Sequence, residues 1–127
     1  MEILFRGMPI NEDRFCPFVY GFPVKNNIVY VNSFYAIVPV FEYTITQYVG
    51  QVDATGKKIF DGDILEFEYD GEKYLVEVFF NEKQSAFCIR DVGYSYCECI
   101  DFVKECKIVG NVFENPELLK KPIEGVK

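Results

Sequence analysis

The stretch QYVGQVDATGKKIFDGDIL, residues 47–65, carries two chain reversals a few residues apart. Asp53 can accept a hydrogen bond from the backbone two residues further on, and Gly56 can take the positive φ that closes such a turn. Asp61 followed by Gly62 offers a second position that tolerates positive φ. Because short apolar runs separate the two turns, this stretch predicts tight β structure and not a helix.

The segment that follows predicts a hairpin. Leu65, Phe67 and Tyr69 alternate with Glu66 and Glu68 before the dipeptide Asp70-Gly71. After it, one face would carry Tyr74, Val76, Val78 and Phe80, and the other Lys73, Leu75, Glu77 and Phe79. This dipeptide favours positive φ at both central positions of a two-residue turn, a geometry that matches the twist of the strands. We expect Glu66 and Glu68 to face solvent, and Phe79 to be half-buried on the second face of the sheet.

The remaining strands are predicted to be short and to be separated by turns. Pro23 indicates that residues 18–24 form an edge strand or a kinked one. Over 34–46 the chain is rich in β-branched and aromatic residues, and we expect its second half, 40–46, to be the strand. Asn115 and Pro116 predict a short C-terminal helix, with the asparagine as its cap. Further strands are expected at 2–6, 28–31, 86–90 and 106–113.

Together these elements predict a mainly β protein. The number and spacing of strands over about 47–113 are typical of a small SH3-like barrel. Residues 1–46 would form an N-terminal β subdomain or extension, and residues 47–127 would hold the barrel and a C-terminal helical turn, in one compact unit. A chain of 127 residues is long enough to bury a core.

Three blocks of the sequence resemble the YopX family of phage and prophage proteins. The first is FRG at 5–7 with VYG at 19–21, where the family has FRG and WVYG. The second is QYVGQVDATGKKIFDGDI at 47–64, where the family has QYTGLKDKNGKEIYEGDI. The third is IVGNVFENPELL at 108–119, where the family has IGNIYENPELL. Val49, Gln51 and Val52 depart from the family pattern.

The resemblance implies a small phage protein with a mostly β fold, and it supplies no catalytic residue and no mechanism. It also marks positions that we expect to have structural roles. These are Arg6, Gly7, Tyr20, Gly21, Tyr48, Gly50, Asp53, Gly56, Ile59, Phe60, Gly62, Asp63, Gly110, Asn111, Asn115 and Pro116.

The side chains that usually carry chemistry are sparse. The chain has no histidine, which removes the commonest general base and every metal site that needs imidazole. The sequence has no phosphate loop, dinucleotide fingerprint or nucleophile elbow. Asp61, Asp63, Glu66 and Glu68 form an acidic cluster, but their turn and solvent-facing positions favour a role in solubility over acid–base or cation chemistry. We expect Arg6 to pair with Asp63 or another carboxylate inside the fold.

The five cysteines do not form a convincing metal site. Structural zinc usually takes four ligands in paired spacings, whereas Cys97, Cys99 and Cys106 would need Cys88 or Cys16 as a fourth ligand. We therefore expect buried, reduced thiols and no metal or other cofactor. The start of the chain lacks a secretory signal and no stretch approaches the length of a membrane span, so we expect a location in the bacterial cytoplasm and no membrane partner.

Charge and aromatic content guide the functional hypotheses. A net charge of −7 argues against direct nucleic-acid binding. A barrel face that bound single strands would need basic residues near Tyr74 or Tyr96. The 22 Phe and Tyr residues exceed what such a core normally holds. The aromatic side chains outside the core would either lie half-covered on strands or form a surface for a partner.

The leading hypothesis is a non-enzymatic phage accessory protein that works by protein–protein contact with a host or phage protein. Exposed edge strands and spare aromatic residues also favour a homo-oligomer. The alternative is an acidic surface that mimics nucleic acid and inhibits a basic host protein.

Overall fold

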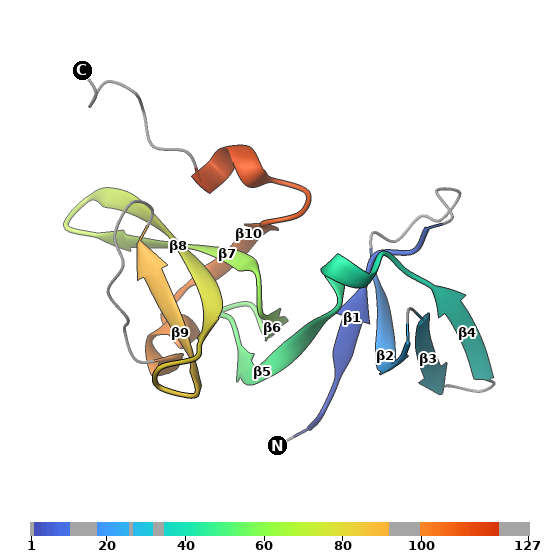
Figure 1. Cartoon of the computed structure of the whole chain (residues 1–127). Coiled ribbons are helices and arrows are strands. Elements are labelled where there is room, and N and C mark those ends of the chain that lie inside the picture. The colour runs from blue at the N-terminus through green and yellow to red at the C-terminus, as the bar shows by residue number, and fades with distance from the viewer. Residues whose placement is uncertain (1, 11–17, 26, 32–34, 92–99, 120–127) are drawn as a thin grey trace. The chain divides into compact units, whose positions relative to one another are not determined.

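The computed structural model of the chain describes residues 2–10, 18–25, 27–31, 35–91 and 100–119 (Figure 1). The fold is mainly β, as predicted, with two antiparallel sheets and three short 3-10 helices in the described part of the chain. It divides into two compact units, Met1–Tyr48 and Val49–Lys127. The predicted boundary between residues 46 and 47 falls two residues earlier, inside strand β5. No helix within these ranges is long and apolar enough to cross a membrane.

The first unit is built on a meander of short strands around a small core. Phe5 and Ile45 pack against the buried residues of this core, which are Val19, Ile28, Val38 and Val40. The sheet order is β4-β3-β2-β1-β5-β6. The elements of the first unit are β1 (Phe5–Gly7), β2 (Val19–Val24), β3 (Asn27–Val31), β4 (Tyr35–Pro39) and the 3-10 helix η1 (Glu42–Thr44). Strand β5 (Thr46–Val52) spans the boundary between the units, and β6 (Lys58–Phe60) belongs to the second unit.

Strand β2 changes partner along its length. Its first half, from Val19 to Gly21, pairs with β1, whereas its second half, from Phe22 to Val24, pairs with β3. Pro23 therefore lies where the pairing with β1 has ended. No hydrogen bond to β1 is needed there, so the missing N–H of the proline costs nothing on that side. The expected edge strand is thus an interior strand of the sheet that has edge character only around the proline.

The predicted strand over 40–46 is wrong. The strand is β4, which ends at Pro39, and a turn of 3-10 helix follows it. Thr44 explains the difference, because its Oγ1 donates to the carbonyl oxygen of Phe41 at 2.6 Å and accepts from the backbone N–H of Met8 at 2.9 Å. These bonds close a tight turn and attach it to a segment 36 residues earlier in the chain.

The second unit contains an open four-stranded sheet in the order β10-β7-β8-β9. No closed barrel is present among the residues that the structure describes, so the SH3-like barrel is not confirmed. A core cluster lies against this sheet: Val49, Ile59, Leu65, Val76, Val78, Ile89, Val103 and Cys106. The elements are β7 (Asp63–Tyr69), β8 (Glu72–Asn81), β9 (Ala86–Asp91), β10 (Lys107–Asn111) and the 3-10 helices η2 (Ile100–Glu105) and η3 (Pro116–Leu119).

The β7–β8 hairpin is confirmed with its predicted turn. Asp70 and Gly71 have φ values of 55° and 80°, so both central residues take the positive φ that the dipeptide favours. Phe79 is half-buried and Glu68 is exposed, as expected, whereas Glu66 is half-buried.

The predicted short C-terminal helix is not confirmed, because the segment forms a single turn of 3-10 helix, η3. Pro116 opens it as predicted, and the backbone N–H of Leu118 donates to the carbonyl oxygen of Asn115 at 3.0 Å. The Asn115 side chain does not cap this turn as expected, because its Oδ1 accepts from the backbone N–H of Asn111 at 3.2 Å instead.

Candidate functional site

Asp53 is a buried carboxylate that connects two distant parts of the second unit. Its Oδ1 accepts from the N–H and Oγ1 of Thr55 at 2.8 and 2.7 Å and from the N–H of Lys57 at 2.9 Å. Its Oδ2 accepts from the N–H of Ile108, on β10, at 3.0 Å. Burial alone would raise the pKa of Asp53, but the hydrogen bonds, led by that from Ile108, lower it below 3.8. This carboxylate is therefore a structural acceptor within the family motif.

Asp63 has a similar role at the second turn of the motif. Its side chain is 1% exposed, and its Oδ2 accepts from the N–H of Phe60 at 2.8 Å. Gly62 has a φ of 94°, and a Cβ there would lie 3.3 Å from a methyl group of Val112. The turn therefore requires both the carboxylate and the glycine for local geometric reasons.

The predicted acidic cluster does not form a site for a cation. Glu66 lies opposite Lys107 in the sheet, and Glu68 lies opposite Lys73. Within the described ranges, no group of three or more Cys, Asp or Glu side chains is placed to hold a metal ion.

The C-terminal family block forms a compact turn around Asn111. Its Oδ1 accepts from the N–H groups of Phe113 and Glu114 at 3.0 and 2.9 Å, and its Nδ2 donates to a carboxylate oxygen of Glu114 at 2.9 Å. Gly110 allows Asn115 to approach, since a Cβ on residue 110 would lie 2.6 Å from the Asn115 Oδ1. These residues therefore hold the chain in place after β10.

The N-terminal family block is also tightly packed. Arg6 is 5% exposed, and its guanidinium carbon lies 4.0 Å from the centre of the Phe18 ring. A Cβ on Gly7 would lie within 3.2 Å of three atoms of Val40. The pairing of Arg6 with a carboxylate stays a prediction. Among the other motif positions, Gly21, Tyr48, Ile59 and Phe60 are buried, whereas Gly50 and Gly56 both have a φ of 90°.

Two of the five cysteines, Cys88 and Cys106, lie in the described residues, and both are buried thiols outside any disulfide bond. Cys16, Cys97 and Cys99 lie outside those residues, so the weighed zinc site stays untested. Burial raises the pKa of Cys106 to about 11, with further contributions from the charges of Glu105 and Asp53.

We expect Cys106 to resist alkylation in the folded protein. Its side chain is fully buried, and a pKa of about 11 leaves little thiolate at pH 8. Mass spectrometry after treatment with iodoacetamide at pH 8 should find this cysteine unmodified in native protein and modified in urea. Equal modification in both conditions would contradict the burial of this thiol.

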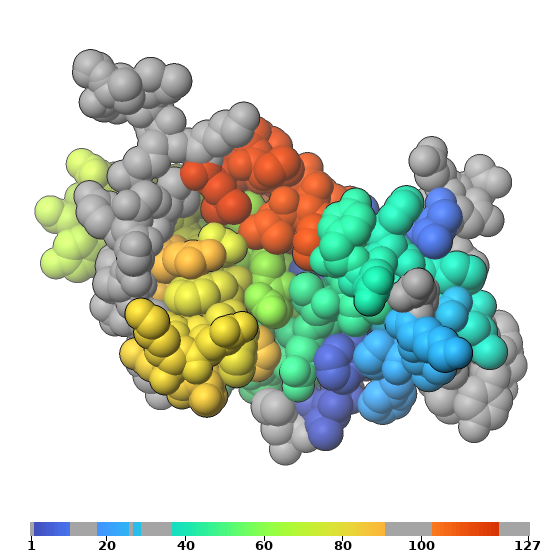
Figure 2. Space-filling model, viewed as in Figure 1, coloured from blue at the N-terminus to red at the C-terminus, as the bar shows by residue number. Residues whose placement is uncertain are grey.

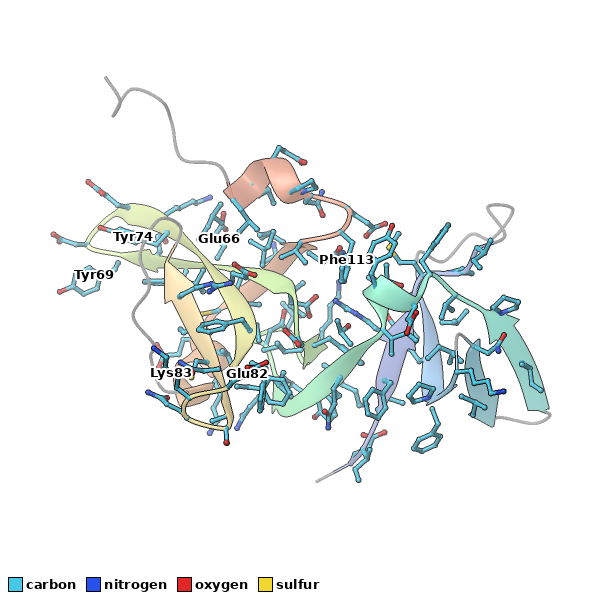
Figure 3. The ribbon with its side chains drawn as sticks, in the orientation of Figure 1. Glu66, Tyr69, Tyr74, Glu82, Lys83 and Phe113 are labelled. Atoms are coloured by element: carbon cyan, nitrogen blue, oxygen red, sulfur yellow. The ribbon has the colours of Figure 1, made fainter. Side chains whose placement is uncertain are left out.

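The β8–β9 turn borders a shallow groove of about 670 Å³. Arg90 forms part of its wall, with its guanidinium carbon 4.1 Å from the centre of the Phe79 ring and its Nε 3.2 Å from a carboxylate oxygen of Glu77. Glu82 and Lys83 contribute opposite charges at the turn (Figure 3). The groove therefore holds mixed charges and no arrangement of nucleophile and base.

An aromatic pair on the hairpin lies beside a carboxylate. Tyr74 stacks on Phe67 with ring centres 5.4 Å apart, and its hydroxyl lies 3.4 Å from a carboxylate oxygen of Glu72. Tyr96 lies outside the described residues.

The most unusual surface is the outer face of β2–β4, by which we mean the exposed side chains of Tyr20, Phe22, Val24 and Ile37. Their exposed fractions are 45, 50, 53 and 68%. An antiparallel sheet that covers a core with one face normally presents polar residues on the other. Here both faces are apolar, and β2 (light blue in Figure 2) reaches the surface.

The strand register places these residues on one face. Phe22 pairs with Val29 of β3, which in turn pairs with Ile37 of β4, so the three positions form a row across the sheet. Tyr20 and Val24 flank Phe22 on the same face of β2, because side chains alternate along a strand. The aromatic surplus predicted exposed rings, but only the register shows where they gather.

Comparison with known proteins identifies a family and a similar fold. A model of the YopX protein family matches residues 19–120. The crystal structure of protein EF1440 from Enterococcus faecalis is similar in fold, with a TM-score of 0.51 and 20% sequence identity over 94% of this chain and 99% of that one. No curated protein matches the sequence significantly. Since the family match spans most of the chain and includes the two motif blocks whose turns are described above, the chain belongs to the YopX protein family.

Proposed function

We propose that this protein acts by protein–protein contact, without catalysis, as an accessory protein encoded by a phage or prophage. The observation that carries the proposal is the outer face of β2–β4, where four apolar side chains are between 45 and 68% exposed. Apolar surface of this kind gains free energy when a partner removes it from water, at about 25 cal/mol per Å².

The roles of the family motif support the same proposal. Asp53, Asp63 and Asn111 use their side-chain oxygens as acceptors for backbone N–H groups of their own turns. These three motif residues thus maintain a scaffold, and none of them lies on the outer face. We expect substitutions of these three residues to change stability, and substitutions of Phe22 or Ile37 to change partner binding.

Nucleic-acid mimicry, the alternative hypothesis, has less support. A mimic needs a continuous negative surface, whereas Lys107 and Lys73 lie opposite Glu66 and Glu68 in the four-stranded sheet. Opposite charges in cross-strand positions offset each other locally. Binding through a mimic would also weaken steeply with salt, while binding through an apolar face would not.

Affinity capture from bacterial host lysate tests the proposal. Wild type should retain a defined protein at low and high salt, Phe22→Lys should lose it, and Tyr69→Lys should keep it. Tyr69 is a matched control because it is an aromatic residue with 68% exposure at the tip of the β7–β8 hairpin (Figure 3). Failure to retain any protein, or equal retention by Phe22→Lys, would refute the proposal. Retention only at low salt would favour the mimic.

A further inference from the structure

We infer that the outer face of β2–β4 is an interface between two copies of this chain, related by a two-fold axis. The inference rests on the proposed function, because it names the occupant of the same face. Two sheets that pack face to face interdigitate apolar side chains from both partners. A second copy would present the same exposed side chains, among them Phe22 and Ile37.

The first argument is the scarcity of exposed charge around this face, where Arg6 lies opposite Tyr20 in the sheet but is only 5% exposed. Residues 18–41, which span β2, β3 and β4, contain a single charged residue, Lys25, whereas the other 103 residues contain 32. Lys25 lies in the turn that follows β2. Some of these uncharged residues form the core, but Tyr20, Phe22, Val24 and Ile37 are exposed. Exposed apolar side chains without charged neighbours in the sequence are costly unless a partner covers them.

The second argument is electrostatic self-complementarity. In a two-fold interface the same patch meets itself, so every charge on the patch approaches a copy of itself. Two copies of a chain with a net charge of −7 repel each other over most of their surfaces. On the outer face this repulsion is weak, because its four exposed side chains are uncharged.

The third argument concerns the division of charge between the two units. Residues 1–48 carry four acidic and three basic side chains, whereas residues 49–127 carry 16 acidic and ten basic ones. A basic partner would therefore be drawn to the second unit. An anionic membrane or a nucleic acid needs clustered Lys and Arg, which the run from 18 to 41 lacks. A neutral apolar face fits a partner surface that is also neutral and apolar. The same face on a second copy of this chain is such a surface.

Sedimentation velocity of the purified protein over a wide concentration range tests the interface. Wild type should show a reversible monomer–dimer equilibrium. Phe22→Lys and, separately, Ile37→Lys should weaken dimerisation by at least about tenfold, because each places a charge in a desolvated interface. Tyr69→Lys makes a similar charge change at an equally exposed position and should dimerise like wild type. Circular dichroism and the urea midpoint show that each variant remains folded.

The outcomes separate this inference from the proposed function. A wild type that stays monomeric at all concentrations, or dimerisation that survives both lysine variants, overturns the two-fold interface. If wild type is monomeric but captures a lysate protein through Phe22, the occupant is another protein and the proposed function stands. If both lysine variants lose dimerisation and wild type captures no lysate protein, the two-fold interface is supported and the proposed contact with a host protein is refuted.

Discussion

Replacing Asp53 with alanine is expected to lower the free energy of unfolding by about 4 kcal/mol, since each backbone donor left buried without an acceptor costs about 1–3 kcal/mol. The substitution removes the acceptor of three backbone N–H groups, those of Thr55, Lys57 and Ile108. It also separates the turn after β5 from β10, which lies 55 residues further along the chain. Urea unfolding followed by circular dichroism measures the change.

Two matched variants control this experiment. Asp53→Asn keeps one acceptor oxygen and should cost about 1–2 kcal/mol. Glu72→Ala removes an exposed carboxylate from the same unit and should change stability by less than about 0.5 kcal/mol. A loss below about 1 kcal/mol for Asp53→Ala would contradict the role of this carboxylate.

Asp53 also gives a predicted pH dependence. Its folded-state pKa lies below 3.8, so the ionised form is favoured by folding. The resulting stability is fully present above the unfolded pKa and is lost as the pH falls through the folded pKa. Between pH 5 and pH 2.5, approximately, wild type should therefore lose more stability than Asp53→Asn, which does not titrate. Parallel stability–pH curves for the two proteins would show that Asp53 does not contribute.

Gly110→Ala is the substitution with the second largest expected effect, a loss of about 2–3 kcal/mol. The new Cβ would lie 2.6 Å from Oδ1 and 3.1 Å from Cβ of Asn115. Relief of this clash moves the Asn115 side chain and breaks its hydrogen bond with the N–H of Asn111. Chemical denaturation again measures the loss.

A double-mutant cycle with Asn115→Ala isolates this clash. Asn115→Ala alone should cost about 1 kcal/mol, because it removes the acceptor for Asn111. The double variant should be more stable than the sum of the two single losses predicts, by about 1 kcal/mol or more, because most of the clashing atoms are gone. Strict additivity would show that the close approach of Asn115 is not what requires glycine at position 110.

Features set by neighbouring residues could be predicted from the sequence. The turn at Asp53 forms because its side chain accepts from Thr55, two residues away, and Gly56 N–H donates to the Asp53 carbonyl at 3.0 Å. The hairpin turn at Asp70 and Gly71 likewise needs only the φ preference of the two residues. Local chemistry decides both structures, so a single sequence is sufficient.

Features that depend on distant partners could not be predicted. The chain turns at Thr44 because its Oγ1 accepts a hydrogen bond from the backbone N–H of Met8. The sequence around 40–46 contains no signal for this contact. Asn115 stands at a position typical of a helix cap, but its side-chain oxygen accepts a hydrogen bond from the backbone N–H of Asn111 instead. In both cases a tertiary hydrogen bond outweighs the local preference.

The location of the outer face belongs to the same category. Alternation along β2 shows that Tyr20, Phe22 and Val24 share one face, but either face could have been the buried one. The other strands decide which face is buried. Ile28 and Val38, which pair with each other, lie on the opposite face and are 0 and 3% exposed. Composition could therefore predict exposed aromatic side chains, but not this surface.

The position of β1 between β2 and β5 has a consequence for biosynthesis (Figure 1). Phe5 pairs with Gly21 on one side and with Gln47 on the other. A ribosome that adds about 5–20 residues per second needs about 2–8 seconds to travel from codon 5 to codon 47. Throughout that interval one edge of β1 in the nascent chain lacks its native partner. Completion of the N-terminal unit therefore awaits translation of the family motif that begins at Gln47.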